Sequence, residues 1–266
     1  MQPFFFGPPD RRLFGVYHAP ARAEMKDCGV VLCHPMAHEY YNAHRYIMQL
    51  AVSLNRAGLA VLRFDYYGTG ESAGEYEETS ISQWLDDIGL ACEELRSRGC
   101  PRLRLAGLRF GATLAMLFCT KNRGQTERSP VYWERSDVDA LVLWEPLANG
   151  TDYLREIADL HREVLASVPA QDEYGEHEFL GFQFSNTLRR EIAAIDLRSD
   201  RLSLGHNVLL MESDAEGSLR PALEAAATHV SYELTPVSPF WQGKHGVRMP
   251  DLAPQRMTSW ILNSCC

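Results

Sequence analysis

The chain has 266 residues, of which 45% are apolar, so it can bury the core of a globular protein. Its 35 Asp and Glu outnumber its 26 Lys and Arg, and the net charge of −9 excludes non-specific nucleic-acid binding as an expected function. The N-terminus has only a short apolar run without a basic flank, so we expect neither a signal peptide nor a membrane span.

Apolar runs of strand length alternate with helical patterns along the chain. The predicted strands are a hairpin over Phe4–Ala19, then Gly29–Cys33, Leu59–Phe64, a run that begins at Leu103, Val138–Trp144, Asn207–Met211 and Tyr232–Leu234. The predicted helices are one with apolar residues from Ile47 that ends at Gly58, one from the cap at Ser80 to Gly99, one after the turn at residue 109 and a closing helix around Trp260. This order predicts an α/β fold with a mostly parallel central sheet and helices on both faces.

Residues 149–204 break this alternation. The segment is long and charged, has a helical pattern, and carries aromatic residues at Phe179, Phe182 and Phe184. A lid over a binding site is typical of such a place in the chain. We therefore expect a single domain over residues 1–266, with a helical lid inserted at Asn149–Leu204.

The most informative motif is Gly107-Leu108-Arg109-Phe110-Gly111. It joins an apolar strand to a helix start, and this G-x-x-x-G frame forms the nucleophile elbow of α/β-hydrolases, which normally has Ser at its centre. The central residue here is Arg109. A guanidinium stays protonated in proteins and has no lone pair that could attack a carbonyl carbon. The motif therefore predicts the hydrolase scaffold without its serine chemistry.

Several segments resemble the serine-aminopeptidase-like branch of the α/β-hydrolases, notably His34-Pro35 after one strand and Phe64–Ser72 after the next. Pro3–Pro8, Leu141–Pro146 and the Arg109 elbow are closer still to the hydrolase-like proteins encoded with the exosortase A system and with acyl-carrier-dependent pathways. The resemblance covers nearly the whole chain. It implies an α/β-hydrolase fold, Arg109 as a subfamily trait, a carrier-tethered or CoA-linked acyl substrate, and an acyl carrier protein as a partner.

The chain order in this fold is nucleophile, acid and base, which gives two further candidates for catalysis. Asp214 follows the strand that ends at Met211 and is the candidate acid. His245 is the only histidine between the last strand and the closing helix, and it is the candidate base, although family spacing favours a position nearer Phe240 or Trp241. Each residue also has a non-catalytic alternative: Asp214 as an acid that forms a turn, and His245 as an ordinary loop histidine.

The helix that follows the elbow predicts an anion site. The first N–H groups of a helix carry partial positive charge, and the N–H of Phe110 corresponds to an oxyanion-hole donor in relatives. A second N–H is expected from Met36, in the loop after His34. With the Arg109 guanidinium, these groups would bind a carboxylate, a phosphate or a sulfate.

Arg109 also has an alternative role, in which it turns from the pocket and pairs with an internal carboxylate. Glu145, Asp65 and Asp214 are the candidate partners, because each follows a predicted strand. Glu145 is a candidate for substrate binding as well.

Three other side chains are candidates at the rim of the pocket. His34 is a candidate for moving protons, although it has a structural role in most proteins of this fold. His38 is a candidate for substrate binding, or it is exposed on the first helix. Tyr66 lies at the carboxyl edge of the sheet, where it either donates a hydrogen bond to a ligand or packs.

The seven cysteines are odd in number and have no metal-ligand spacing outside the adjacent pair at the C-terminus. They predict reduced thiols in a cytoplasmic protein, and the residues indicate no metal and no other cofactor. Three functions remain. The first is an enzyme that acts on a small-molecule acyl or anionic substrate with Arg109 as an anion clamp. The second is a non-catalytic protein that binds an anionic ligand or a carrier protein. The third is a hydrolase that uses another nucleophile or direct attack by water.

Overall fold

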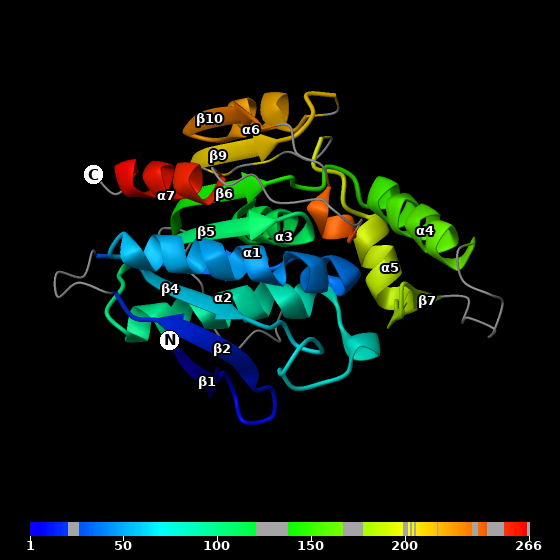
Figure 1. The fold of residues 1–266 in the computed structure, drawn as a ribbon, viewed down its shortest axis with the longest axis horizontal. Coiled ribbons are helices and arrows are strands. Elements are labelled where there is room, and N and C mark those ends of the chain that lie inside the picture. The colour runs from blue at the N-terminus through cyan, green and yellow to red at the C-terminus, as the bar shows by residue number, and fades with distance from the viewer. Residues whose placement is uncertain are drawn as a thin grey trace.

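The computed structural model describes residues 1–20, 27–120, 138–166, 178–198, 202, 204, 206–216, 218–235, 239–243 and 253–264. Its main sheet has eight strands in the order β1-β2-β4-β3-β5-β6-β9-β10 (Figure 1). The strands of this sheet are β1 (Gln2–Phe6), β2 (Leu13–His18), β3 (Cys28–Cys33), β4 (Ala60–Phe64), β5 (Arg102–Leu108), β6 (Val138–Trp144), β9 (Asn207–Glu212) and β10 (His229–Leu234). The β1–β2 and β2–β4 pairs are antiparallel, and every pair from β4 to β10 is parallel.

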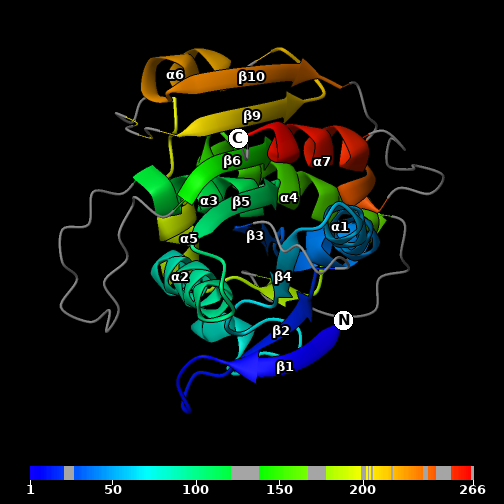
Figure 2. The ribbon, with the colours of Figure 1, turned by 90° about the vertical axis from the view of Figure 1, so that its left-hand side faces the viewer.

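Helices cover both faces of this sheet (Figure 2). The helical elements are α1 (Ala37–Arg56), the 3-10 turn η1 (Tyr76–Glu78), α2 (Ile81–Ser97), α3 (Phe110–Thr120), α4 (Gly150–Ala166), α5 (Asn186–Ala193), α6 (Arg220–Ala226), the 3-10 turn η3 (Phe240–Gln242) and α7 (Ala253–Asn263). One buried cluster joins the sheet to α2 and α3, and a second joins it to α1 and α7. This arrangement confirms the predicted fold class.

The central strands show why the prediction of the sheet succeeds. In β3, Val31 and Cys33 pack in the cluster of α2 and α3, whereas Val30 and Leu32 pack in the cluster of α1 and α7. A strand that is buried on both faces needs apolar residues at every position, so it is a continuous apolar run in the sequence. No helix in the described part of the chain is long and apolar enough to cross a membrane.

The first helix differs from its predicted extent. The apolar spacing marks the first helix only from Ile47 to Gly58, whereas α1 begins at Ala37 and so includes His38, as one of its two expected placements had it. Its first turns carry polar residues because much of their surface faces solvent, and Glu39 is a buried exception. The pattern of apolar residues therefore gave no signal for this half of the helix. Two short features, α6 and the β7–β8 hairpin (Glu178–Phe179 and Phe182–Gln183), were also not predicted.

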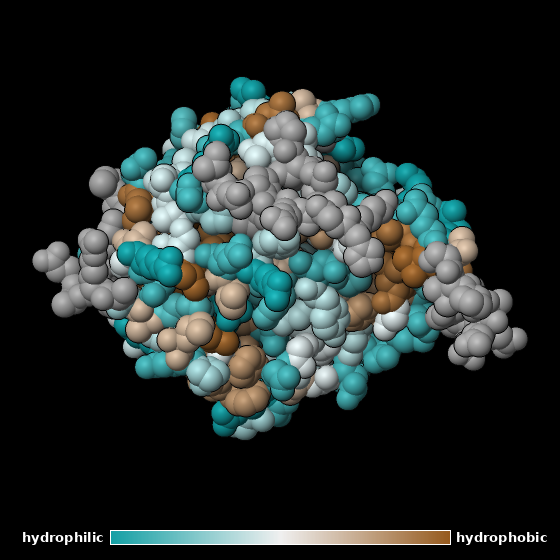
Figure 3. Space-filling model, viewed as in Figure 1, coloured by the Kyte–Doolittle hydropathy of each residue, from teal (hydrophilic) through white to brown (hydrophobic). Residues whose placement is uncertain are grey.

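Within the 149–204 segment, α4, α5 and the β7–β8 hairpin lie beyond the carboxyl ends of the strands (Figure 1). In the space-filling view, apolar surface gathers near β7 and α5 (Figure 3). Phe179, Leu180 and Phe182 from this hairpin region are partly buried against the main core. The α4–α5 layer thus borders the edge of the sheet where open α/β folds bind ligands.

The elbow between β5 and α3 depends on close backbone packing. A Cβ atom at Gly111 would lie 2.3 Å from the carbonyl oxygens of Cys33 and His34, far inside van der Waals contact. Only glycine therefore lets the first turn of α3 approach the end of β3. This contact fixes residue 109 at the carboxyl edge of the sheet.

Candidate active site

Arg109 is the residue at the strand-to-helix turn. Its φ angle is 53°, which lies in the left-handed region that non-glycine residues adopt rarely. Its N–H donates to the carbonyl oxygen of Trp144 at 2.9 Å, and its own carbonyl accepts from the N–H of Ala112 at 3.0 Å. Hydrogen bonds from β6 and α3 thus hold the strained turn in place.

The Arg109 guanidinium is bound by two carboxylates from different helices. Its Nε donates to Glu39 Oε1 in α1 at 2.9 Å, and its Nη2 donates to Glu156 Oε2 in α4 at 2.7 Å. The Arg109 side chain is 9% exposed and the Glu39 side chain 1% exposed, whereas Glu156 is 36% exposed. One buried arginine therefore connects α1, the elbow and α4.

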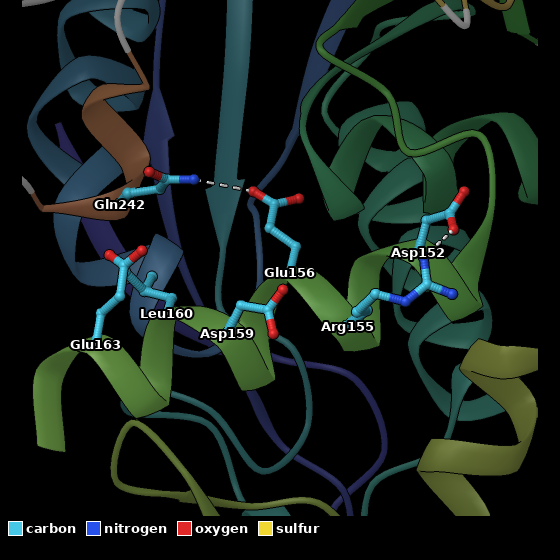
Figure 4. Close-up of a pocket in the computed structure, with 7 residues that line it drawn as sticks. All are labelled: Asp152, Arg155, Glu156, Asp159, Leu160, Glu163 and Gln242. Atoms are coloured by element: carbon cyan, nitrogen blue, oxygen red, sulfur yellow. Dashed lines mark hydrogen bonds and ion pairs between the residues drawn. The ribbon is translucent and has the colours of Figure 1, made fainter. Parts of the chain in front are cut away.

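The second oxygen of each carboxylate also has a donor. Tyr153 Oη donates to Glu39 Oε2 at 3.3 Å, and Gln242 Nε2 donates to Glu156 Oε1 at 3.1 Å. Figure 4 shows Gln242 and Glu156 approaching each other from η3 and α4. Hydrogen bonds thus satisfy all four carboxylate oxygens around Arg109.

Two aromatic rings complete the surroundings of the guanidinium. Its Cζ lies 5.1 Å from the centre of the Trp241 ring and 5.8 Å from that of Tyr153. Both distances are within the range of a cation–π contact. We call the four residues around the guanidinium, Glu39, Tyr153, Glu156 and Trp241, the guanidinium cage.

The charges in the cage depend on one another. Burial raises the pKa of Glu39, and the adjacent Arg109 opposes that rise. Burial by itself would lower the pKa of Arg109, but Glu39 and Glu156 outweigh it and raise the pKa above its ordinary value. Arg109 is therefore a permanent cation, and two carboxylates already compensate its charge.

A cleft of about 210 Å³ lies beside Arg109 at the carboxyl edge of the sheet. Carboxylates dominate its wall. The charged residues that line it are Arg109, Arg198, Glu145, Asp152, Glu156, Glu212, Asp214 and Glu216. We call it the elbow cleft.

A second depression, of about 360 Å³, lies along α4 (Figure 4). It is lined by Asp152, Arg155, Glu156, Asp159, Leu160, Glu163 and Gln242. Asp152 and Glu156 line both hollows, so these two residues lie between them. Both hollows are net negative, and in the described residues no group of three or more His, Cys, Asp or Glu could hold a metal ion.

Three of the predicted site residues line the elbow cleft. Besides Arg109, these are Glu145 and Asp214. Glu145 directly follows β6 and has a φ angle of 49°, and burial raises its pKa. Asp214 is exposed, and its Oδ1 accepts from the N–H of Glu216 at 3.0 Å, as expected of a turn-forming acid. The candidate base His245 lies outside the described residues.

The other predicted site residues in the described part of the chain do not line the cleft. Met36 precedes α1 and is 3% exposed, and Phe110 begins α3 and is fully buried. Tyr66 is buried, and burial followed by the neighbouring Cys33 thiol raises its pKa. His38 is half-buried, and burial followed by Arg109 lowers its pKa to about 4.

His34 is buried beneath α1 and does not line the elbow cleft. Its ring lies 5.3 Å from that of Tyr40, whose hydroxyl donates to Asp65 at 2.8 Å. Burial, and then the positive charge of Arg63, lower the pKa of His34 to about 3. A neutral, packed histidine at this position fits the structural role that was the alternative to proton transfer.

Residues 26–191 match the family model described as serine aminopeptidase, S33. The chain belongs to this family. A search of curated proteins finds no match. The serine aminopeptidase S33 assignment confirms the family resemblance stated for His34-Pro35 and Phe64–Ser72.

Solved structures of α/β-hydrolases have the same fold. A putative hydrolase from Agrobacterium vitis S4 is 19% identical with a TM-score of 0.61, over 100% of this chain and 98% of that chain. Est1E from Butyrivibrio proteoclasticus, with ferulic acid bound, is 15% identical with a TM-score of 0.66, over 98% of both chains. A proline iminopeptidase from Mycobacterium smegmatis is 13% identical with a TM-score of 0.60, over 99% of both chains. At these identities, the similarity to solved structures shows the fold of this chain and nothing about its substrate.

The partners of Arg109 were not predicted from the sequence. Glu39 and Glu156 lie 70 and 47 positions from Arg109; Glu39 is the one acidic residue of α1, and the other acidic residues of α4 are exposed. Neither is part of a motif, and the three candidate partners that were named all follow strands instead. The sequence did indicate the position of Trp241, because family spacing predicts a site residue near positions 240 and 241.

We predict that His34 contributes to the pH dependence of stability. Its pKa is about 3 in the folded chain and about 6.5 in the unfolded chain, so between these values only the unfolded chain takes up the proton. The stabilisation is present above pH 6.5 and is lost as the pH falls. Between pH 4 and 6, the unfolding free energy of the wild type should therefore fall more steeply with decreasing pH than that of His34→Asn, by about 1.4 kcal/mol per pH unit. Urea titrations at several pH values measure both slopes.

His229→Asn is the matched control, because His229 is exposed on β10, away from His34. Its slope should follow that of the wild type. Equal slopes for His34→Asn and the wild type would contradict the prediction.

Proposed function

We propose that this chain is a non-hydrolytic member of its family that binds a small ligand in the elbow cleft. The observation that carries the proposal is the double ion pair of Arg109 with Glu39 and Glu156. A permanently charged guanidinium at the elbow has no lone pair to attack an acyl carbon. Two of its N–H donors already bind the protein's own carboxylates.

The surroundings of Arg109 support the loss of the other catalytic roles as well. Trp241, at the position where family spacing favours the base, stacks on the Arg109 guanidinium and has no proton to exchange near neutral pH. Asp214 is exposed and bonds within its own turn. Among the described residues, no histidine lines the elbow cleft. A serine-type reaction needs a nucleophile, a base and an acid that contact one another, and the described residues of the cleft do not provide this set.

The charge of the cleft favours a ligand with a cationic group. Six carboxylates and two arginines line the cleft, and one of those arginines is already paired twice. A carboxylate or phosphate at Arg109 would have to compete with Glu39 and Glu156, which already compensate the charge of the guanidinium. Since Oε1 of Glu145 is buried without a hydrogen-bond partner, an amine is a better match to this cleft than an acyl anion or a phosphopantetheine group.

We further propose that residues 149–204 form a cap over this cleft. Support comes from α4, which supplies both Tyr153 and Glu156 to the cage, and from Gln242, which bonds Glu156 from the side of η3. In this arrangement Arg109 holds the cap closed, so the residue at the elbow has a structural role in access to the cleft.

The absence of hydrolysis is tested with p-nitrophenyl esters and aminoacyl p-nitroanilides. We expect the wild type and Arg109→Ala to release p-nitrophenol and p-nitroaniline at the same background rate, because neither has a nucleophile at the elbow. Arg198→Ala controls for the loss of an arginine from the same cleft. Hydrolysis by the wild type that falls at least about 100-fold in Arg109→Ala, but not in Arg198→Ala, would contradict the proposal.

The sign of the ligand is tested separately, by titrating the wild type with butylamine and with butyrate. We expect saturable binding of butylamine only, and an affinity about tenfold weaker in Glu145→Gln, because a buried carboxylate that pairs with an ammonium contributes about 1.5 kcal/mol. Glu93→Gln, which removes one carboxylate from α2, should bind like the wild type. Tighter binding of butyrate would reject a cationic ligand.

A further inference from the structure

The guanidinium cage surrounds its occupant on several sides. Glu39 in α1 and Glu156 in α4 accept hydrogen bonds from two different nitrogens of Arg109, at 2.9 and 2.7 Å. The rings of Tyr153 and Trp241 lie 5.8 and 5.1 Å from its central carbon. Three separate segments of the chain thus converge on one planar cation.

The cage residues are costly to bury without a cation. Glu39 is 1% exposed, and among the described residues only the Tyr153 hydroxyl donates to its side chain besides Arg109. A buried carboxylate that loses its counter-charge is strongly unfavourable. A positive charge between Glu39 and Glu156 removes this cost, whether or not that charge belongs to residue 109.

We propose that the guanidinium cage is a cation site that Arg109 occupies as a tethered ligand, and that a small external alkylguanidinium binds there when the Arg109 side chain is absent. Entry is through the elbow cleft, because Arg109 and Glu156 line the wall between cleft and cage. Truncation at residue 109 therefore joins the cleft to the cage. The inference is independent of whether the wild type binds a ligand in the cleft.

The geometry favours a guanidinium over an ammonium. The two acceptors receive Nε and Nη2, which point in different directions from one planar group. The faces of that plane are available to the Trp241 and Tyr153 rings. An ammonium is a compact point charge that reproduces neither the fork nor the stacking.

The test uses the thermal unfolding midpoint of full-length Arg109→Ala with millimolar ethylguanidinium. We expect a saturable rise of about 3 °C at ten times the dissociation constant, because ligand bound only to the folded chain stabilises it. Ethylurea, a neutral analogue of the same shape, should give no rise, and ethylammonium a smaller one. Equal shifts with ethylurea and ethylguanidinium would overturn the proposal.

Two further variants test whether ethylguanidinium binds in the cage and not in the cleft. Glu39 does not line the elbow cleft, so Arg109→Ala/Glu39→Gln removes a cage acceptor and leaves the cleft intact. This double variant should lose the response to ethylguanidinium. Arg198→Ala, which also removes an arginine from the cleft, should show no more response than the wild type. A double variant that responds as strongly as Arg109→Ala would assign the binding to the cleft and overturn the proposal.

If Arg109→Ala is obtained only as unfolded protein, the readout becomes the yield of folded protein on dilution from denaturant. Recovery with ethylguanidinium and not with ethylurea supports the cage as a cation site. No recovery with either compound rejects it.

Discussion

The ion pair between Arg109 and Glu39 is the interaction on which the site depends. Neither charge could be buried alone, because removing an ionised group from water costs several kcal/mol that only a close partner offsets. Glu156 adds the second contact and connects this pair to α4, while Glu39 belongs to α1. The elbow, the first helix and the α4 layer are thus held at fixed positions by one buried cation.

The same scaffold that positions a nucleophile in hydrolases here positions a charge. The turn at residue 109 keeps the left-handed conformation of an elbow, and Gly111 keeps the close approach of α3 to β3. What differs is the side chain at the turn, which here pairs with Glu39 and Glu156. The function of a fold depends on such local chemistry, since one scaffold supports many reactions and also none.

The sheet could be predicted from the sequence because its central strands are buried on both faces, which leaves continuous apolar runs such as Cys28–Cys33. The elbow could be predicted because its glycines and the strand-to-helix change are local in sequence. The partners of Arg109 could not, since Glu39 and Glu156 come from helices far along the chain and resemble surface acids. Strand ends suggested Glu145 in their place. Only packing in three dimensions distinguishes these acids.

The most direct measurement is a crystal structure of the wild-type protein from crystals grown at neutral pH with sulfate. The observation needed is which groups contact the Arg109 guanidinium. We predict a guanidinium held between Glu39 and Glu156 with its face against Trp241, and sulfate absent from the elbow cleft. A guanidinium that has left both carboxylates and instead binds sulfate together with the Phe110 N–H would contradict the internal ion pair. It would restore the anion clamp as the role of Arg109.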